Sequence, residues 1–101
     1  MLCRPEREIR AEFYGQAVDP VVYLLRCADG TLYCGWTVDL EKRVSAHNAG
    51  TASRYTRSRR PVAVLASVSV DDRSAALREE ARVKRLKRPE KLALARNWPR
   101  P

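Results

Sequence analysis

The sequence predicts an α+β fold: a small three-stranded antiparallel sheet flanked by helices, in the order β-β-α-β-α-α. Two short apolar runs are joined by a turn that contains glycine, which is typical of a hairpin. A third such run follows later, and the segments on either side of it carry helix-capping residues. The chain of 101 residues is long enough for one domain with one core, but not for a second core.

The hairpin is expected to join residues 21–27 (VVYLLRC) to residues 31–36 (TLYCGW). A three-residue loop would place the Tyr23 and Tyr33 side chains on the same face of the sheet, because side chains alternate along a strand. A two-residue Asp-Gly loop would shift the register by one residue and place the two tyrosines on opposite faces. The sequence leaves both registers open.

The segment after the hairpin is expected to be helical. Asp39 is a suitable N-cap for a helix over residues 40–48. Gly50 suits the end of that helix, because glycine readily adopts the left-handed conformation found there. Residues 50–60 are polar and rich in arginine, so we expect a loop or a short helix.

The remaining segments predict one strand and two helices. Residues 61–70 (PVAVLASVSV) have the composition of the third strand. Asp72 or Ser74 caps the next helix, which runs to about Leu86. Pro89 lies where a proline is tolerated, in the first turn of a last helix.

The expected domain covers residues 21–97. Residues 1–20 lack a clean periodicity and are expected to form an N-terminal extension, and residues 98–101 a short C-terminal tail. The charges within residues 1–20 do not fit a secretory signal peptide. No apolar run approaches the ~20 residues of a membrane-spanning helix, so we expect no membrane association.

The charge of the chain indicates a polyanionic partner. Lysine and arginine number 20 against 12 aspartate and glutamate, for a formal net charge of +8. Guanidinium groups match phosphate oxygens in a two-pronged geometry, so nucleic acid is favoured over the alternative of a basic protein without such a partner. The 3 cysteines form no CxxC pair, which argues against a zinc site or a disulfide framework and fits a reducing, cytoplasmic location.

The helix after the hairpin carries the first candidate pair, Arg43 and His47. These residues are four apart, so both lie on one helix face, which Leu40 and Val44 would anchor to the core. A cation and an imidazole held at the edge of a core can reach the same phosphate. The alternative is a solvated arginine and a surface histidine.

Glu80 is the second candidate. On a helical wheel it falls near the middle of an apolar arc formed by Ala76, Leu77 and Val83. A carboxylate in such a place is costly unless it is paired or binds a cation. Divalent ions of the magnesium class take oxygen ligands, and one or two carboxylates are enough. The alternative is a pair with a neighbouring arginine.

An arginine cluster is the third candidate. Arg54, Arg57, Arg59 and Arg60 are interleaved with Tyr55 in the polar segment. Such a cluster would bind phosphates in a salt-dependent way, and Tyr55 could stack on an unpaired base. The alternative is a solvated loop.

Several of these residues occur together in a known pattern. They are, in chain order, Val22-Tyr23-Leu24, Tyr33-Cys34-Gly35, Asp39-Leu40, Arg43, His47, Arg54-Tyr55-Thr56 and Leu77-Arg78-Glu80. In order and spacing this pattern resembles the GIY-YIG nuclease superfamily. It is most similar to the small stand-alone bacterial subgroup of the YhbQ type, which in turn is similar to the catalytic subunit of eukaryotic structure-specific endonucleases. The first motif lacks its Gly and Ile, and Trp36 stands where excision-repair relatives carry a lysine.

The resemblance implies a role for each matched side chain. Tyr33 would be the general base or would orient the attacking water, and Tyr23 would support it by hydrogen bonding. Arg43 would hold the scissile phosphate, and His47 would assist proton transfer or phosphate binding. Glu80 would be the one protein ligand of a divalent metal, Mg²⁺ or Mn²⁺.

The resemblance therefore implies a divalent-metal-dependent endonuclease that hydrolyses phosphodiester bonds in DNA, with structure-specific cleavage and a role in DNA repair as options. The alternative is a non-catalytic nucleic-acid-binding module with the same fold. A third option is an interaction subunit with an acidic protein partner. DNA is the expected partner, a further protein could supply target specificity, and a monomer is expected.

Overall fold

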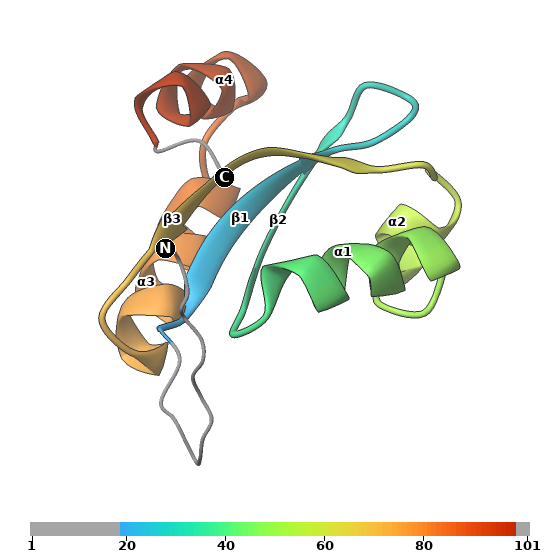
Figure 1. Cartoon of the computed structure of the whole chain (residues 1–101). Helices are drawn as coiled ribbons and strands as arrows, with labels where there is room; N and C mark the ends of the chain where they lie inside the picture. The colour runs from blue at the N-terminus through green and yellow to red at the C-terminus, as the bar shows by residue number, and fades with distance from the viewer. Residues whose placement is uncertain (1–18, 99–101) are drawn as a thin grey trace, which may run out of the picture.

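The architecture was obtained as a computed structural model that describes residues 19–98 (Figure 1). The expected N-terminal extension lies outside the described residues, except for its last two positions, and so do residues 99–101. Pro20 is already part of the fold, because its carbonyl oxygen accepts the Val70 N–H at 2.9 Å. No helix among residues 19–98 is long and apolar enough to span a bilayer.

The predicted α+β order is confirmed, with one short additional helix. The elements are β1 (Val21–Arg26), β2 (Leu32–Thr37), α1 (Leu40–Ala49), α2 (Arg54–Arg57), β3 (Ala63–Ser69), α3 (Arg73–Lys84) and α4 (Arg88–Asn97). The three strands form one antiparallel sheet in the order β2-β1-β3, so β1 is central and β2 is an edge strand. The arginine-rich segment forms α2, which the sequence left open between loop and short helix.

The hairpin adopts the register of the three-residue loop. Tyr23 pairs with Gly35, and Leu25 pairs with Tyr33. Gly30 closes the loop with φ 84°, a left-handed conformation that favours glycine. Tyr23 and Tyr33 therefore lie on the same face of the sheet.

The ends of the helices follow the capping residues. The Asp39 side chain accepts the Lys42 N–H at the start of α1, and Gly50 ends this helix with φ 84°. Asp72, one of the two candidates, caps α3 by accepting the Ala75 N–H at 2.8 Å. Each such cap stabilises a helix by about 1 kcal/mol.

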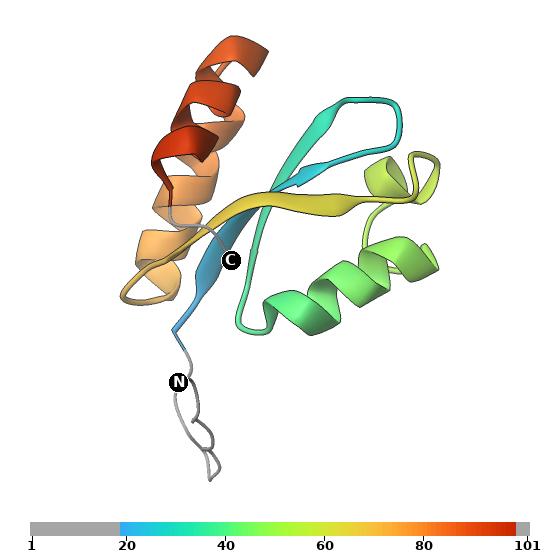
Figure 2. The same ribbon diagram turned by 45° about the horizontal axis from the view of Figure 1, so that its top comes forward.

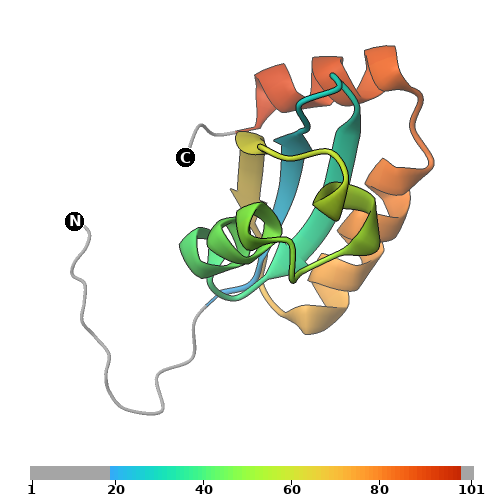
Figure 3. The same ribbon diagram turned by 90° about the vertical axis from the view of Figure 1, so that its right-hand side faces the viewer.

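The sheet has helices on both faces. Figure 2 and Figure 3 show α3 and α4 on one side of the sheet and α1 and α2 on the other. The α3 side buries alternate strand residues with Ala76, Val83, Ala95 and Trp98; the strand residues are Val22, Leu24, Cys34 and Ala66. The α1 side buries Tyr23, Leu25, Cys27 and Val62, against which Tyr33, Leu40, Val44 and Val64 pack. Full burial of a leucine such as Leu24 contributes roughly 1.5–3 kcal/mol.

One expectation about the core, the apolar arc of α3, needs correction. Leu77 is 49% exposed, so the buried stripe of α3 consists of Ala76 and Val83 alone. Glu79 and Glu80 both border that stripe, with side chains 22% and 20% exposed. Trp98, one residue into the expected tail, is buried in the core. With so few apolar residues on α3, the wheel did not determine which face would be buried.

Candidate active site

A buried chain of polar side chains links β1 to α1 and α2. The Tyr23 hydroxyl lies 3.0 Å from His47 Nε2, and His47 Nδ1 lies 2.7 Å from the Thr56 hydroxyl. All three residues are at most 1% exposed. The Thr56 hydroxyl also donates to the Ser53 carbonyl oxygen at 3.4 Å. These bonds satisfy polar groups that would be costly to bury without partners.

The sequence places the members of this chain by simple periodicities. Leu40, Val44 and His47 occur at positions i, i+4 and i+7 of α1 and therefore face the sheet together. Gly35 makes room for the phenol ring on the neighbouring strand. A Cβ on Gly35 would lie 2.6 Å from the Tyr23 hydroxyl oxygen, so no larger residue fits there without a shift of the ring.

Burial keeps both ring systems uncharged at neutral pH. It raises the pKa of Tyr23 to about 12, although the Arg43 guanidinium acts in the opposite direction. Burial, and secondarily the same guanidinium, lowers the pKa of His47 below its usual value. Tyr23 is therefore a poor base, and the imidazole is neutral. The electrostatic effect of Arg43 on both groups also shows that its guanidinium lies near them.

Tyr33 is the tyrosine of this face that solvent can reach. It is half-buried, whereas Tyr23 is fully enclosed. Its ring lies edge-on to His47, with centroids 5.2 Å apart, and is stacked on Tyr55 at 5.7 Å. Arg59 lies over the Tyr55 ring with Cζ 3.9 Å from the centroid. Aromatic contacts of this kind fix the direction of the Tyr33 ring.

The predicted arginine cluster divides into two pairs. Arg59 Nε donates to Asp29 Oδ2 at 3.0 Å, and its Nη1 donates to the Tyr55 carbonyl oxygen at 2.9 Å. Arg60 Nε donates to the Arg57 carbonyl oxygen at 2.9 Å. Arg59 and Arg60 thus hold the segment itself together.

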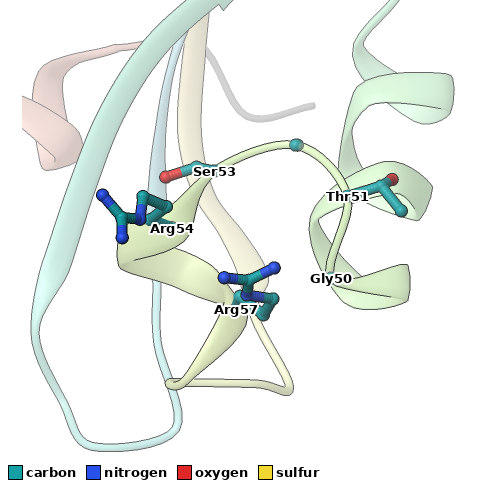
Figure 4. A pocket seen from close by; sticks show the side chains of 6 residues that line it. Gly50, Thr51, Ser53, Arg54 and Arg57 are labelled. Atoms are coloured by element: carbon teal, nitrogen blue, oxygen red, sulfur yellow. The ribbon is translucent and has the colours of Figure 1, made fainter.

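Arg54 and Arg57 form the second pair. Both side chains are exposed and make no hydrogen bond or ion pair with another described side chain. They line a depression of ≈ 430 Å³ together with residues 50–53 (Figure 4). Figure 4 shows their guanidinium groups leaving α2 in different directions, so they can meet separate anions.

Glu80 lies on the other side of the sheet from the tyrosines. It is on α3, which packs against the face of β1 and β2 that carries Cys34. Burial raises the pKa of the Cys34 thiol to about 12, and the Glu80 carboxylate contributes to that shift. Cys34 is the neighbour of Tyr33 on the edge strand. The structure therefore brings Tyr23, Tyr33, Arg43 and His47 together, whereas Glu80 lies on the opposite face of β2.

Within residues 19–98 a divalent cation would have to be held by a single carboxylate rather than by a cluster of ligands. No group of three or more histidine, cysteine or acidic side chains is gathered within residues 19–98. Both carboxylate oxygens of Glu79 are held by Arg82, at 2.9 and 2.7 Å. Glu80 has one contact with Lys84, at 3.3 Å, which leaves an oxygen free to bind a cation. Magnesium retains several waters, so one carboxylate suffices.

Sequence reasoning missed two residues that organise this region. Thr56, which the sequence pattern included only within Arg54-Tyr55-Thr56 and without a role, is the fully buried partner of His47. Asn48 bonds both backbone groups of Val62, donating at 3.1 Å and accepting at 2.7 Å. Neither contact follows from a helix or strand period, because each crosses a loop.

The sheet carries paired tyrosines on one face, and the next helix carries an arginine and a histidine beside them. The family described as the GIY-YIG catalytic domain matches residues 19–93, and the chain therefore belongs to this family.

Its relatives carry the name UPF0213 protein. One from Syntrophus aciditrophicus is 48% identical over 79 residues, which cover 77% of this chain and 91% of the relative. One from Halobacterium salinarum is 48% identical over 73 residues, which cover 72% of this chain and 95% of the relative. The solution structure of a protein from E. faecalis is similar with a TM-score of 0.58 and 34% identity, over 80% of this chain and 86% of the other. The solution structure of a UPF0213 protein from Bacillus halodurans is similar with a TM-score of 0.51 and 35% identity, over 78% of this chain and 84% of the other.

Proposed function

We propose that this protein is a divalent-metal-dependent endonuclease that hydrolyses phosphodiester bonds in DNA. The observation that carries the proposal is the arrangement on the α1 face of the sheet. A buried Tyr23–His47–Thr56 chain supports a solvent-accessible phenol, Tyr33, beside an exposed guanidinium, Arg43. The family and the net charge of +8 support the same conclusion.

Tyr33 and Arg43 are the residues that would touch the reacting groups. Tyr33 would orient the attacking water or accept its proton, and Arg43 would hold the scissile phosphate and stabilise the charge that develops on it. Both side chains reach solvent. Tyr23 and His47 are fully enclosed and would act as positioning residues, since their hydrogen bond fixes the surface on which Tyr33 rests.

A phenol alone is a weak base at neutral pH. A free tyrosine has a pKa of about 10, so ionising it at pH 7 costs roughly 4 kcal/mol. A divalent cation, held by Glu80, would supply the remaining effect by making a water more acidic and neutralising phosphate charge. The edge position of β2 supports this role, because a phosphate at that edge lies between the face of Tyr33 and the face of Glu80.

A plasmid-nicking assay with magnesium or manganese, with and without a chelator, tests the proposal. Tyr33→Phe and Glu80→Ala should each fold normally and slow cleavage about 100-fold or more. Glu79→Ala is the matched control, because Glu79 is equally half-buried on the same helix but paired with Arg82. It should cut at nearly the wild-type rate.

Each outcome has a separate meaning. Wild-type cleavage by Glu80→Ala would remove Glu80 from the mechanism, and wild-type cleavage by Tyr33→Phe would do the same for Tyr33. If the wild-type protein cuts none of a panel of duplex, flap, fork, single-stranded and RNA substrates with either metal, the endonuclease proposal fails. A non-catalytic nucleic-acid-binding module would then be the better description.

A further inference from the structure

A second basic surface lies outside the tyrosine cluster, at the turn that joins β2 to α1. Two depressions of ≈ 450 Å³ and ≈ 340 Å³ open there and share Thr37, Val38 and Arg43 in their walls. Lys42 lines the first, and Arg73, the first residue of α3, lines the second. Because the two depressions share these walls, they are neighbours, and we call them together the turn groove. Figure 3 shows the β2–α1 turn and the start of α3 at the same end of the molecule.

The lining of the turn groove holds more cations than carboxylates. Lys42, Arg43 and Arg73 are exposed, and none forms an ion pair with a carboxylate in residues 19–98. One carboxylate, Asp39, also lines the first depression, where it accepts the Lys42 N–H at 3.1 Å, and Asp72, next to Arg73, accepts an N–H of α3 at 2.8 Å. Positive charge therefore accumulates in the groove, and an anion that enters it is stabilised.

The floor of the turn groove is apolar. Val38 is 52% exposed between the cations. The Trp36 ring lies beneath the Arg73 guanidinium, with Cζ 5.6 Å from the ring centroid. A sugar–phosphate chain alternates anionic phosphates with apolar sugar faces and is complementary to both features.

We propose that the turn groove binds the phosphates next to the scissile one on the substrate strand. The inference rests on the proposed function, because Arg43 is both the residue assigned to the scissile phosphate and a shared wall of the groove. A strand held there continues past Lys42, which is adjacent on α1, and reaches Arg73 across the turn. Lys42 and Arg73 are then positioning residues for the strand.

Oligonucleotide binding by charge-removing variants tests the turn groove. We would measure the affinity of Lys42→Ala, Arg73→Ala and the double variant for labelled single-stranded and duplex DNA, in EDTA, over a range of salt concentrations. Each lost phosphate contact makes the slope of log affinity against log salt shallower by about 0.7–0.9. The double variant should therefore lose about 1.4–1.8 from the slope. Arg96→Ala on α4 removes an exposed charge outside the groove and is the matched control.

In the cleavage assay the double variant should raise KM several-fold at an unchanged kcat, which a general loss of folding would not do. The inference is overturned if the double variant has the slope and affinity of Arg96→Ala. Binding is measured without metal and is independent of cleavage. If the protein cuts no substrate, the endonuclease proposal fails, but the salt slope still tests whether the turn groove binds DNA.

Discussion

Gly35 and Tyr23 face each other across β2 and β1, and a Cβ on Gly35 would lie 2.6 Å from the Tyr23 hydroxyl oxygen. Gly35→Ala should therefore force the phenol ring to move and break its 3.0 Å contact with His47. We expect a loss of about 1–3 kcal/mol in the free energy of unfolding, measured by urea denaturation. In a Tyr23→Leu background the same substitution should cost much less. An equal cost in both backgrounds would show that the ring is not what excludes a side chain at this position.

Because His47 is buried, we expect the unfolding free energy of the protein to decrease in mild acid. It is the chain's 1 histidine, and its pKa in the folded protein lies below the usual value because it is buried. Protons then bind the unfolded chain more readily than the folded one as the pH falls below about 6.5. The contribution of this group to stability is complete above that pH and is lost below it.

The measurement is the unfolding free energy of the wild type minus that of His47→Gln, at several pH values from 7.5 to 5. This difference in unfolding free energy should become smaller as the pH is lowered, by at most about 1.4 kcal/mol per pH unit. Carboxylates titrate in both proteins and cancel in the difference. A difference that does not change with pH would mean that His47 accepts a proton in place, without loss of the Tyr23 and Thr56 contacts.

At the scale of single residues, the sequence predicted the candidates better than their surroundings. The two-residue period of the strands and the 3.6-residue period of α1 predict that Tyr23, Tyr33 and His47 lie together on the α1 side of the sheet, once the hairpin register is known. Their degree of burial did not follow, and it decides that Tyr33 reaches solvent whereas Tyr23 does not. The contact of Thr56 with His47 was not predictable, because the two residues are nine positions apart and separated by a loop.

At the scale of elements, an amide side chain joins the end of α1 to Val62, the residue before β3. Asn48 donates to the Val62 carbonyl oxygen and accepts the Val62 N–H, as a neighbouring strand would. Asn48→Ala leaves both groups of a buried residue without partners, so we expect a loss of about 1–3 kcal/mol in unfolding free energy. Asn48→Asp keeps the acceptor and should cost less. Equal stability of Asn48→Ala and the wild type would contradict this role.

Element boundaries were predictable wherever the signal is local. Asp39, Gly50 and Asp72 each act within one turn of the helix they limit, and the structure places helix ends at all three. The orientation of α3 was not predictable, because Leu77 carries as much apolar weight in the sequence as Val83. Packing against β1 and β2 selected the face with Ala76 and Val83 instead.

At the scale of the whole molecule, the sequence did not predict how the two sides of the sheet share the proposed chemistry. The tyrosines lie on the α1 face and Glu80 on the α3 face, an arrangement that depends on the way both helices pack on one sheet. Residues from separate elements can meet at the edge strand β2 only because this strand has a single neighbour. Such an edge has no signature in the spacing of motifs.

The basic residues behind the net charge of +8 likewise do not all have the same role. Arg54 and Arg57 reach solvent and have no side-chain partner within residues 19–98, whereas Arg59 and Arg60 hold backbone and Asp29. Removal of Arg54 and Arg57 together should make the slope of log DNA affinity against log salt shallower by about 1.4–1.8, with no change in unfolding free energy.

Removal of Arg59 and Arg60 together should instead lower the unfolding free energy, since it frees carbonyl oxygens of Tyr55 and Arg57, and should change the slope less. The same salt titration and a urea denaturation of each double variant separate the two roles. Equal slopes for both double variants would mean that all four arginines meet phosphates alike. In that case the internal contacts of Arg59 and Arg60 would have to open when nucleic acid binds.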